Sequence, residues 1–365
     1  MTVLIIQICD SPIGGGAELI ANKLSELIKI KNAKSYGIFL NNKNKIKLKS
    51  NQIVIGNYNP KNLLNFFKLY FKIIKLAKGY SRIILHGHLV HALYFLVPFS
   101  FLKRFTLLYT EHSEARNRRK YHFIKPIEKY IYSRYKKVFS ISPQIQSNLL
   151  NWLDIYNEDN KSKKKFFTIY NGATKYKFLV RNYEKDKYNL LSIGNLHIHK
   201  GFDITIKAIS HCKEIVKSYT IVGEGSNRKS LQEIINQRNL SKIIKLHGYD
   251  NRIHKFLKKS DLGLIPSRWE GFGLVGIEML SSGIPLCISN AKGMSDILKD
   301  FNSVKIINHL NEKVWAENII QMLQSLDSMK KDIKKSSVMA SKFSLEEMIK
   351  NYSKQYIEII RSFNC

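Results

Sequence analysis

Short apolar runs alternate along the chain with longer segments in which apolar residues recur at helical spacing. An apolar run of four to eight residues bounded by turn residues is typical of a buried strand, and the amphipathic segments are typical of helices that cover a sheet. The first half predicts strands over 3–8, 83–86, 106–109, 138–141 and 166–170, and helices over 17–29 and from Ser142-Pro143 onward. This alternation predicts a doubly wound α/β unit with a parallel sheet.

The same alternation restarts in the second half. It predicts strands over 190–193, 219–222, 243–246, 262–265 and 285–289, and helices over 202–212, 229–238 and 274–282. The stretch 174–188, rich in Lys, Tyr and Asn, is a plausible linker, and an amphipathic helix over 344–363 ends the chain. A length of 365 residues also suits two domains. We therefore expect two Rossmann-like domains, over 1–178 and 187–343, and a C-terminal helical segment over 344–365.

Cysteine usage and the apolar runs indicate a reduced compartment and no membrane-spanning segment. The four cysteines are widely separated, so they predict neither a zinc site nor a disulfide framework. The apolar run 3–6 has no basic segment before it and predicts a strand rather than a signal peptide. The most apolar stretch, 88–102, contains His91 and Pro98 and is shorter than the ~20 residues of a spanning helix. We expect a cytoplasmic protein that is soluble or peripheral.

The net charge of +32 points to an anionic partner: nucleic acid, an anionic membrane or a phosphate-bearing substrate. The abundance of Lys, Asn and Ile, typical of AT-rich coding sequence, explains much of this charge equally well. The excess is uneven, however, because residues 1–180 carry 31 Lys and Arg against 9 Asp and Glu. Composition alone does not account for that concentration in the first half.

The segment 266–278 carries the clearest chemistry. Glu270 and Glu278 are separated by seven residues, with a Gly-rich turn between them that opens the predicted helix. Gly271 and Gly273 allow close approach of a ligand, and the N–H groups of residues 273–275 form a helix N-terminus suited to phosphate. A carboxylate at 278 can accept from ribose hydroxyls, and one at 270 from sugar hydroxyls. The alternative is an ordinary turn followed by a partly exposed helix.

The segment resembles the EX7E signature of retaining glycosyltransferases, in particular glycosyltransferase family 4, whose members have the GT-B fold of two Rossmann-like domains facing a central cleft. The resemblance covers most of the chain. Its other motifs, in family order, are Gly14-Gly15-Gly16-Ala17-Glu18, Thr110-Glu111-His112, Tyr170-Asn171-Gly172, Gly194-Asn195-Leu196 with Lys200-Gly201, Gly223-Glu224-Gly225, His247-Gly248-Tyr249 and Gly283-Ile284-Pro285.

The resemblance implies roles for individual residues. Lys200 would bind the donor pyrophosphate, Glu278 the ribose and Glu270 the donor sugar. His112 would lie near the reacting carbon, so that Glu270 and His112 are the expected catalytic residues. The expected donor-binding residues are Lys200, Asn195, Gly271, Phe272, Gly273, Leu274, Val275, Glu278, Gly14, Gly15, Gly16, Gly223, Tyr249 and Arg268.

Two departures from the family pattern bear on these roles. Asn195 stands where the family usually has an arginine beside the phosphate, which removes a cation. Lys200 would then work with another base, for which Arg268 and His199 are candidates. The aspartate that often follows Asn-Gly is also absent, since Ala173 stands there.

The sequence contains no Asp-x-Asp pair of the kind that usually holds Mg²⁺ or Mn²⁺ on a donor diphosphate. We expect metal-independent transfer, with no cofactor, in which Lys200 and the helix amides stabilise the leaving phosphate. The sequence offers no candidate for a covalent nucleophile. Retention by front-face attack, with the leaving phosphate accepting the acceptor's proton, is therefore the expected mechanism.

Two basic segments of the first half, 61–80 and 116–137, mix lysines and arginines with large apolar residues. Such segments suit an anionic membrane surface, although outer helices of a Rossmann-like domain have similar patterns. The resemblance adds lipid-linked acceptors received by the first domain. We therefore expect a peripheral enzyme on the inner face of the cytoplasmic membrane. It would transfer sugar from a nucleotide sugar, UDP-linked rather than GDP-linked, to a glycan or lipid-linked acceptor in bacterial capsule or lipopolysaccharide synthesis.

Other functions fit less well. A nucleic-acid-binding protein would explain the charge, but the chain has no helix-turn-helix, zinc or RNA-binding signature. An NAD-dependent oxidoreductase needs Gly-x-Gly-x-x-Gly, and Leu19 and Arg228 stand where its last glycine belongs. An epimerase or phosphorylase with the same fold remains possible.

Overall fold

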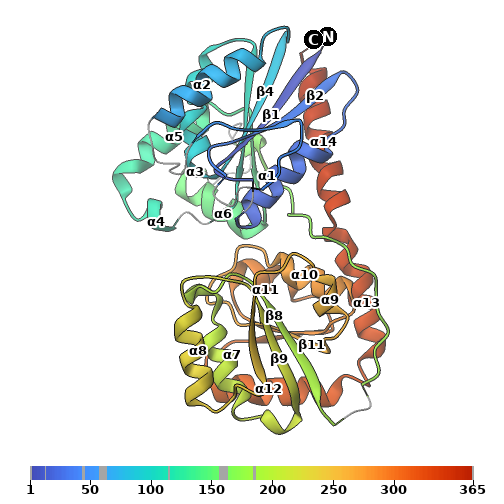
Figure 1. Cartoon of the computed structure of the whole chain (residues 1–365). Coiled ribbons are helices and arrows are strands. Elements are labelled where there is room, and N and C mark those ends of the chain that lie inside the picture. The colour runs from blue at the N-terminus through green and yellow to red at the C-terminus, as the bar shows by residue number, and fades with distance from the viewer. Residues whose placement is uncertain are drawn as a thin grey trace. The chain divides into compact units, whose positions relative to one another are not determined.

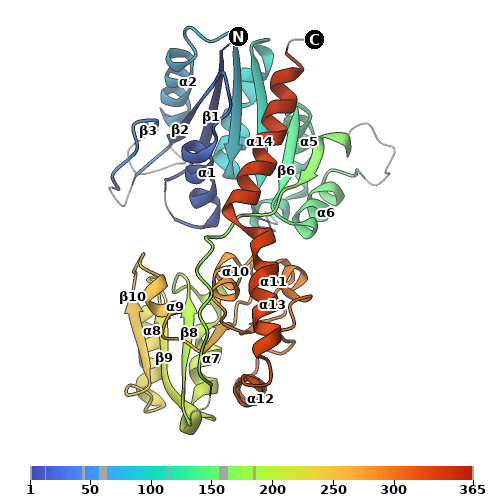
Figure 2. The same cartoon turned by 90° about the vertical axis from the view of Figure 1, so that its right-hand side faces the viewer.

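The computed structural model describes residues 2–12, 14–42, 46–56, 64–113, 116–155, 163–183 and 186–363 (Figures 1 and 2). The chain divides into two compact units. The first comprises Met1–Gly172 together with Glu346–Cys365, and the second is Ala173–Leu345. Each unit contains a parallel sheet covered by helices, so the α/β class and the two Rossmann-like units expected from the sequence are confirmed.

The first sheet has the strand order β3-β2-β1-β4-β5-β6-β7. Its strands are β1 (Val3–Cys9), β2 (Ala33–Phe39), β3 (Gln52–Val54), β4 (Arg82–His88), β5 (Phe105–Glu111), β6 (Lys137–Ser140) and β7 (Phe166–Thr168). Its helices are α1 (Gly16–Leu27), α2 (Leu64–Leu76), α3 (Leu89–Phe95), α4 (Arg116–Arg119), α5 (Lys125–Ser133) and α6 (Pro143–Trp152), with α14 (Leu345–Arg361) from the end of the chain. All seven residues of β1 are buried, as both faces of a central parallel strand must be.

The two faces of this sheet are covered by different helices (Figures 1 and 2). Alternate residues of β1, beginning with Leu4, pack with Leu69 of α2, Leu93 of α3 and Ile131 of α5. On the opposite face lie α1 and α14, and Gln7 of β1 donates a hydrogen bond to Tyr356 of α14. Because successive strand residues point to opposite faces, the second face receives the polar Gln7.

The second sheet has the strand order β10-β9-β8-β11-β12-β13. Its strands are β8 (Tyr188–Ile193), β9 (Val216–Val222), β10 (Ile244–Gly248), β11 (Leu262–Ile265), β12 (Leu286–Ser289) and β13 (Val304–Ile307). Its helices are α7 (Phe202–Ile209), α8 (Arg228–Gln237), α9 (His254–Leu257), α10 (Leu274–Ser281), α11 (Lys292–Leu298), α12 (Glu312–Ser325) and α13 (Lys330–Ala340).

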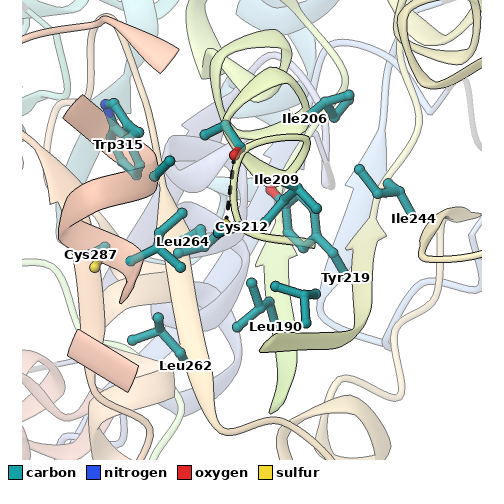
Figure 3. Packing of buried hydrophobic residues seen from close by; sticks show 14 of the residues in the cluster. Leu190, Ile206, Ile209, Cys212, Tyr219, Ile244, Leu262, Leu264, Cys287 and Trp315 are labelled. Carbon is teal, nitrogen blue, oxygen red and sulfur yellow. Dashed lines mark hydrogen bonds between the residues drawn. The ribbon is translucent and has the colours of Figure 1, made fainter. Parts of the chain in front are cut away.

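The core of the second unit lies between its sheet and helices α7 and α12 (Figure 3). Leu190 and Leu264 of the sheet, Ile206 of α7 and Trp315 of α12 are fully or almost fully buried there. The Tyr219 hydroxyl, also buried, makes hydrogen bonds to Ser192 and Thr205 at 2.7 and 2.8 Å. The core therefore fixes β8, β9 and β11, whose ends carry the Gly-rich loops.

The strands expected from the sequence are all present, although several begin or end one to three residues away from the expected bounds. The pattern missed β2, β3 and β13. Only three of the seven residues of β2 are buried, and β3 has just three residues, so neither produces a continuous apolar run. The pattern also did not predict the helices α3, α9, α11, α12 and α13.

The last helix, α14, matches the amphipathic segment expected over 344–363. Its buried residues are Met348, Tyr352, Tyr356 and Ile359, which follow helical spacing and pack within the first unit. In the part of the chain that the structure describes, no helix is both long enough and apolar enough to cross a bilayer.

Candidate active site

The candidate site of the second unit lies at the carboxyl ends of β8 and β11. The loop after β8 carries Lys200 and the loop after β11 carries Glu270. Because the carboxyl ends of parallel strands share one edge of a sheet, these loops become neighbours despite their separation in sequence. Lys200 Nζ lies 2.5 Å from Glu270 Oε2. The fold therefore joins the expected phosphate-binding lysine to the expected sugar-binding glutamate.

The two loops are held together through their backbones. Arg268 donates its backbone N–H to the His199 carbonyl at 2.7 Å. Gly201 adopts a left-handed conformation with φ of 69°, and a Cβ there would lie 2.0 Å from the Pro266 carbonyl oxygen. Glycine is thus required on both conformational and steric grounds. This close approach sets the distance between Lys200 and Glu270.

The Lys200–Glu270 ion pair is partly exposed. The side chains of Lys200 and Glu270 retain 22% and 18% of their accessible surface, respectively. The Ser267 hydroxyl lies 3.5 Å from the same carboxylate oxygen. Both charged groups are within reach of a ligand and neutralise each other in its absence. A diphosphate would compete with the Glu270 carboxylate for the lysine.

The turn after Glu270 leads into the first turn of α10. Phe272 is buried and its ring packs edge to face against Phe343, which anchors the turn. Gly271 and Gly273 are buried, whereas Leu274 and Val275 are half-buried. The N–H groups at the start of a helix lack partners within it and favour a negatively charged ligand. The expected phosphate-binding amides therefore stand at a helix start close in sequence to Glu270.

Glu278 lies one turn further along α10 and is 8% exposed. One of its carboxylate oxygens accepts a long hydrogen bond from the Thr174 N–H at 3.4 Å. Burial raises the pKa of Glu278 to about 7, and this hydrogen bond opposes the shift. Because the pKa of this carboxyl group lies near 7, a ligand whose hydroxyl groups donate hydrogen bonds to it would stabilise the charged form.

Other expected donor-binding residues have different surroundings. Arg268 makes a bidentate ion pair with Asp203, at 2.7 Å for each nitrogen, and donates to the Ile198 carbonyl. It therefore holds α7 and the 198–200 turn to the β11 loop in this structure. The side chains of Asn195 and Tyr249 are exposed. A Cβ at Gly223 would lie 1.9 Å from the Gly194 carbonyl oxygen, so this glycine allows two loops to pack together.

The remaining expected residues lie at the carboxyl ends of strands in the first unit. Gly14, Gly15 and Gly16 follow β1 and are exposed, and Gly15 donates its N–H to the Glu18 carboxylate at 2.9 Å. His112 follows β5 and is only 8% exposed. Its Nε2 lies 2.9 Å from His88 Nδ1. His112 is thus part of a buried polar cluster rather than a surface side chain.

Sequence reasoning missed several residues that support the site. Asp203, the partner of Arg268, had no visible signal because the pair forms across 65 positions. His86 and His88 in β4 did have a signal in the sequence, since histidines at alternate strand positions point to the same face. Within the described ranges, no three His, Cys, Asp or Glu side chains gather as a metal-binding group.

The buried Glu278 predicts a measurable dependence of stability on pH. Its folded-state pKa of about 7 exceeds the ordinary value of 4.5, so the folded protein binds this proton more tightly than the unfolded chain. The contribution of Glu278 to the free energy of unfolding is therefore lost as the pH rises from 4.5 to about 7, the unfolded-state and folded-state pKa values. We expect Glu278→Gln to be more stabilising at pH 8 than at pH 5, by about 2 kcal/mol.

Chemical unfolding of the ligand-free protein at both pH values measures this difference. Glu233→Gln on α8, where the side chain is exposed, is the matched control and should show no such dependence. An equal effect of Glu278→Gln at pH 5 and pH 8 would contradict the burial argument.

Comparison with known proteins supports a specific family. Residues 176–337 match the family model described as glycosyl transferases group 1. The chain is 28% identical over 197 residues to the Campylobacter jejuni enzyme named N-acetylgalactosamine-N,N'-diacetylbacillosaminyl-diphospho-undecaprenol 4-alpha-N-acetylgalactosaminyltransferase. It is 26% identical over 264 residues to CapH of Staphylococcus aureus, a capsular polysaccharide biosynthesis glycosyltransferase.

These alignments differ in extent. The first covers 54% of this chain and 49% of the Campylobacter enzyme, and the second covers 70% of this chain and 73% of CapH. The crystal structure of HepE from Anabaena, in complex with UDP and glucose, superposes with a TM-score of 0.78 at 18% identity. That match covers 99% of this chain and 100% of HepE, so the fold extends over both units. The second unit is therefore similar to the glycosyl transferases group 1 family over residues 176–337, and the chain as a whole has the GT-B fold of glycosyltransferases.

Proposed function

We propose that the chain transfers a sugar from a nucleotide-diphosphate sugar to a glycan or lipid-linked acceptor, with retention of configuration and without a metal ion. The observation that carries the proposal is the 2.5 Å pair of Lys200 and Glu270, followed in the chain by the first turn of α10. It combines a cation for a diphosphate with a carboxylate for a sugar. The match of residues 176–337 to the glycosyl transferases group 1 model supports the same class of reaction.

Charge on the leaving diphosphate is the main demand of the reaction. Lys200 supplies one positive charge, and the unpaired N–H groups at the start of α10 supply oriented dipoles. These groups are held in place by the fold before the ligand arrives, which reduces the cost of reorganisation. They take the role that a divalent cation has in transferases with a carboxylate pair.

When the diphosphate binds Lys200, the ion pair between Lys200 and Glu270 breaks. The Glu270 carboxylate then accepts hydrogen bonds from hydroxyls of the donor sugar and stabilises positive charge at the anomeric carbon. The bond from that carbon to the phosphate oxygen breaks, and a bond to the acceptor oxygen forms on the same face. The acceptor's proton passes to the leaving phosphate oxygen, so no protein base is required.

The nucleoside side of the donor is assigned to Glu278. Ribose hydroxyls can donate to its buried carboxylate and so offset the desolvation that raises its pKa. We assign UDP rather than GDP as the nucleotide. HepE, which shares the fold, has been crystallised with UDP, and this similarity supports the choice.

We assign acceptor binding to the first unit. We also assign to this unit an association with the cytoplasmic face of a membrane. Large apolar side chains stand exposed on α2 and around α5, namely Leu64, Phe67, Phe71, Phe123, Ile127 and Tyr130. On α2 the exposed Lys68 and Lys75 share the helical stripe of Leu64 and Phe71. Aromatic side chains beside lysines suit insertion among anionic headgroups. Similarity to a transferase named for an undecaprenol-linked substrate and to CapH supports a role in surface polysaccharide synthesis.

Replacement of Glu270 tests the transfer reaction. We expect Glu270→Gln to lower kcat for sugar transfer at least a hundredfold, because the neutral amide stabilises developing positive charge poorly. Affinity for the nucleotide sugar should not fall, because the amide no longer competes for Lys200. Initial rates with and without EDTA, and the anomeric configuration of the product by NMR, complete the measurement. The exposed Glu233→Gln is the matched control; near-normal turnover of Glu270→Gln, or activity abolished by EDTA, would overturn the corresponding assignment.

Replacement of Lys200 tests the diphosphate site separately. We expect Lys200→Ala to weaken UDP binding by roughly 10- to 100-fold, since hydrogen bonds to charged groups contribute about 1.5–3 kcal/mol. Calorimetric titration with UDP measures the change. Lys217→Ala removes an exposed lysine from β9 and serves as the control. Equal affinities of the two variants would exclude Lys200 from the site.

Charge reversal on α2 tests the membrane surface. We expect Lys68→Glu with Lys75→Glu to weaken binding to vesicles of phosphatidylcholine and phosphatidylglycerol by at least about 2 kcal/mol, roughly thirtyfold. The double variant Lys229→Glu with Lys242→Glu makes the same change of net charge on exposed positions of the second unit. Sedimentation with vesicles compares the two. If both double variants lose binding equally, net charge rather than the α2 surface governs association.

A further inference from the structure

A continuous chain of buried hydrogen bonds extends from His112 to the C-terminal helix. His112 Nε2 lies 2.9 Å from His88 Nδ1, and His88 Nε2 lies 3.0 Å from Gln7 Oε1. Gln7 Nε2 donates to the Tyr356 hydroxyl at 2.8 Å. That hydroxyl lies 2.6 Å from His86 Nδ1. Gln7, His86, His88 and Tyr356 have no exposed surface.

The directions of these hydrogen bonds are coupled, because a neutral imidazole donates through one nitrogen and accepts through the other. Two arrangements satisfy the contacts. In the first, Gln7 accepts from His88 Nε2–H, so His88 Nδ1 accepts from His112 Nε2–H. In the second, the amide of Gln7 is reversed, every direction is inverted and His112 carries its proton on Nδ1.

The two arrangements differ in what they leave at His112 Nδ1, which is buried and without a hydrogen-bond partner in the described chain. The first leaves a lone pair there, and the second leaves an N–H donor. Buried N–H groups without an acceptor are rarer than acceptors without a donor. The Gln7 amide has the orientation that the first arrangement requires, with Nε2 on Tyr356 and Oε1 on His88. Both observations favour the first arrangement.

Burial also keeps these imidazoles neutral. It lowers the pKa of His112 and of His86 to about 3, and it holds the pKa of His88 well below its usual value. The neighbouring imidazoles add to the shift of His86 and His88. At neutral pH His112 thus has one proton, and its location is decided by His88.

We propose that Gln7 and His88 are positioning residues that hold His112 as the Nε2–H tautomer, so that its Nδ1 accepts a hydrogen bond from a hydroxyl of the sugar substrate. The proposal rests on the proposed transfer reaction and on the place near the reacting carbon that the family resemblance implies for His112. It also defines the ligand, because only a hydrogen-bond donor satisfies the remaining lone pair. An ether or carbonyl oxygen at the same place would leave Nδ1 unsatisfied.

The arrangement gives α14 a role beyond packing. In the first arrangement Tyr356 accepts from the Gln7 amide, so α14 supplies the partner for the amide N–H that points away from His88. Without an acceptor at position 7, His88 would keep a buried N–H unpaired unless it moved its proton to Nδ1. His112 would then accept through Nε2 and carry its own proton on Nδ1.

The tautomer can be measured directly in the wild-type protein without ligand. Long-range ¹H–¹⁵N spectra of histidine-labelled protein distinguish protonated from unprotonated ring nitrogens, and His112→Gln identifies the signals by their loss. We expect protonated Nε2 and unprotonated Nδ1 for His112. A protonated Nδ1 in the wild type would overturn the proposal even if transfer is confirmed. Absence of transfer would instead refute the proposed function and leave the tautomer to be judged by these spectra.

Variants test whether the tautomer matters for turnover. Gln7→Met keeps the shape of the side chain but removes the acceptor, and Gln52→Met makes the same change at another buried glutamine of the first unit. We expect Gln7→Met to move the His112 proton to Nδ1 and to lower kcat roughly tenfold, as loss of about one hydrogen bond implies. KM for the nucleotide sugar should be unchanged, and Gln52→Met should affect neither property.

A stability loss alone does not reproduce this result, since both methionine variants remove buried hydrogen bonds. Retention of the His112 tautomer and of kcat in folded Gln7→Met would contradict the proposal. If Gln7→Met fails to fold, Tyr356→Phe removes only the hydroxyl, with Tyr135→Phe, a buried tyrosine outside the hydrogen-bond chain, as its control. Tyr356→Phe should shift His112 toward the Nδ1–H tautomer, and a tautomer as uniform as in the control would contradict the proposal.

Discussion

The parallel arrangement of both sheets is the constraint on which the candidate site depends. A strand buried on both faces must be followed by a connection that returns over the sheet, so every strand of a unit ends at the same edge. Loops far apart in sequence therefore become neighbours there. Lys200 and Glu270 meet for this reason, and so do His88 and His112 at the ends of β4 and β5. Gly201 completes the arrangement in the second unit by allowing its loop to touch the Pro266 carbonyl.

The charged side chains of the second-unit site differ in their partners and in their exposure to solvent. Lys200 and Glu270 neutralise each other but remain partly exposed, which leaves both open to exchange with a ligand. Arg268 is held by Asp203 in a bidentate pair and acts as a structural link between α7 and the β11 loop. Glu278 accepts a long hydrogen bond from the Thr174 N–H, and its burial raises its pKa. The second-unit site thus contains one partly exposed ion pair and one buried carboxylate with a raised pKa.

Local patterns were sufficient to predict the elements that position the site. The apolar runs of β1, β8 and β11 and the glycines around Glu270 and Lys200 are continuous signals in the sequence. They predict a buried strand followed by a loop, which is what the structure contains. The half-polar β2 produced no such run because it pairs near the edge of its sheet and buries only part of its length.

Partners that depend on tertiary packing were beyond the sequence. The sequence near Arg268 does not indicate that its guanidinium is bound by Asp203, and its expected role in donor binding stays a prediction. His112 appeared as a lone histidine at a strand end, whereas the fold surrounds it with His88, Gln7 and, through them, Tyr356 of the last helix. Such pairs form between strands that are neighbours only in the sheet.

Hydrolysis of nucleotide sugars by the wild-type protein, in the absence of acceptor, tests the central claim most directly. Each of several UDP- and GDP-sugars is incubated with the protein, and early release of nucleotide and free sugar is followed by NMR. The proposed function predicts slow release of UDP from one UDP-sugar, with the sugar first appearing in the donor's own anomeric configuration. Failure to bind or cleave any nucleotide sugar, together with thermal stabilisation by NAD or an oligonucleotide alone, would contradict it.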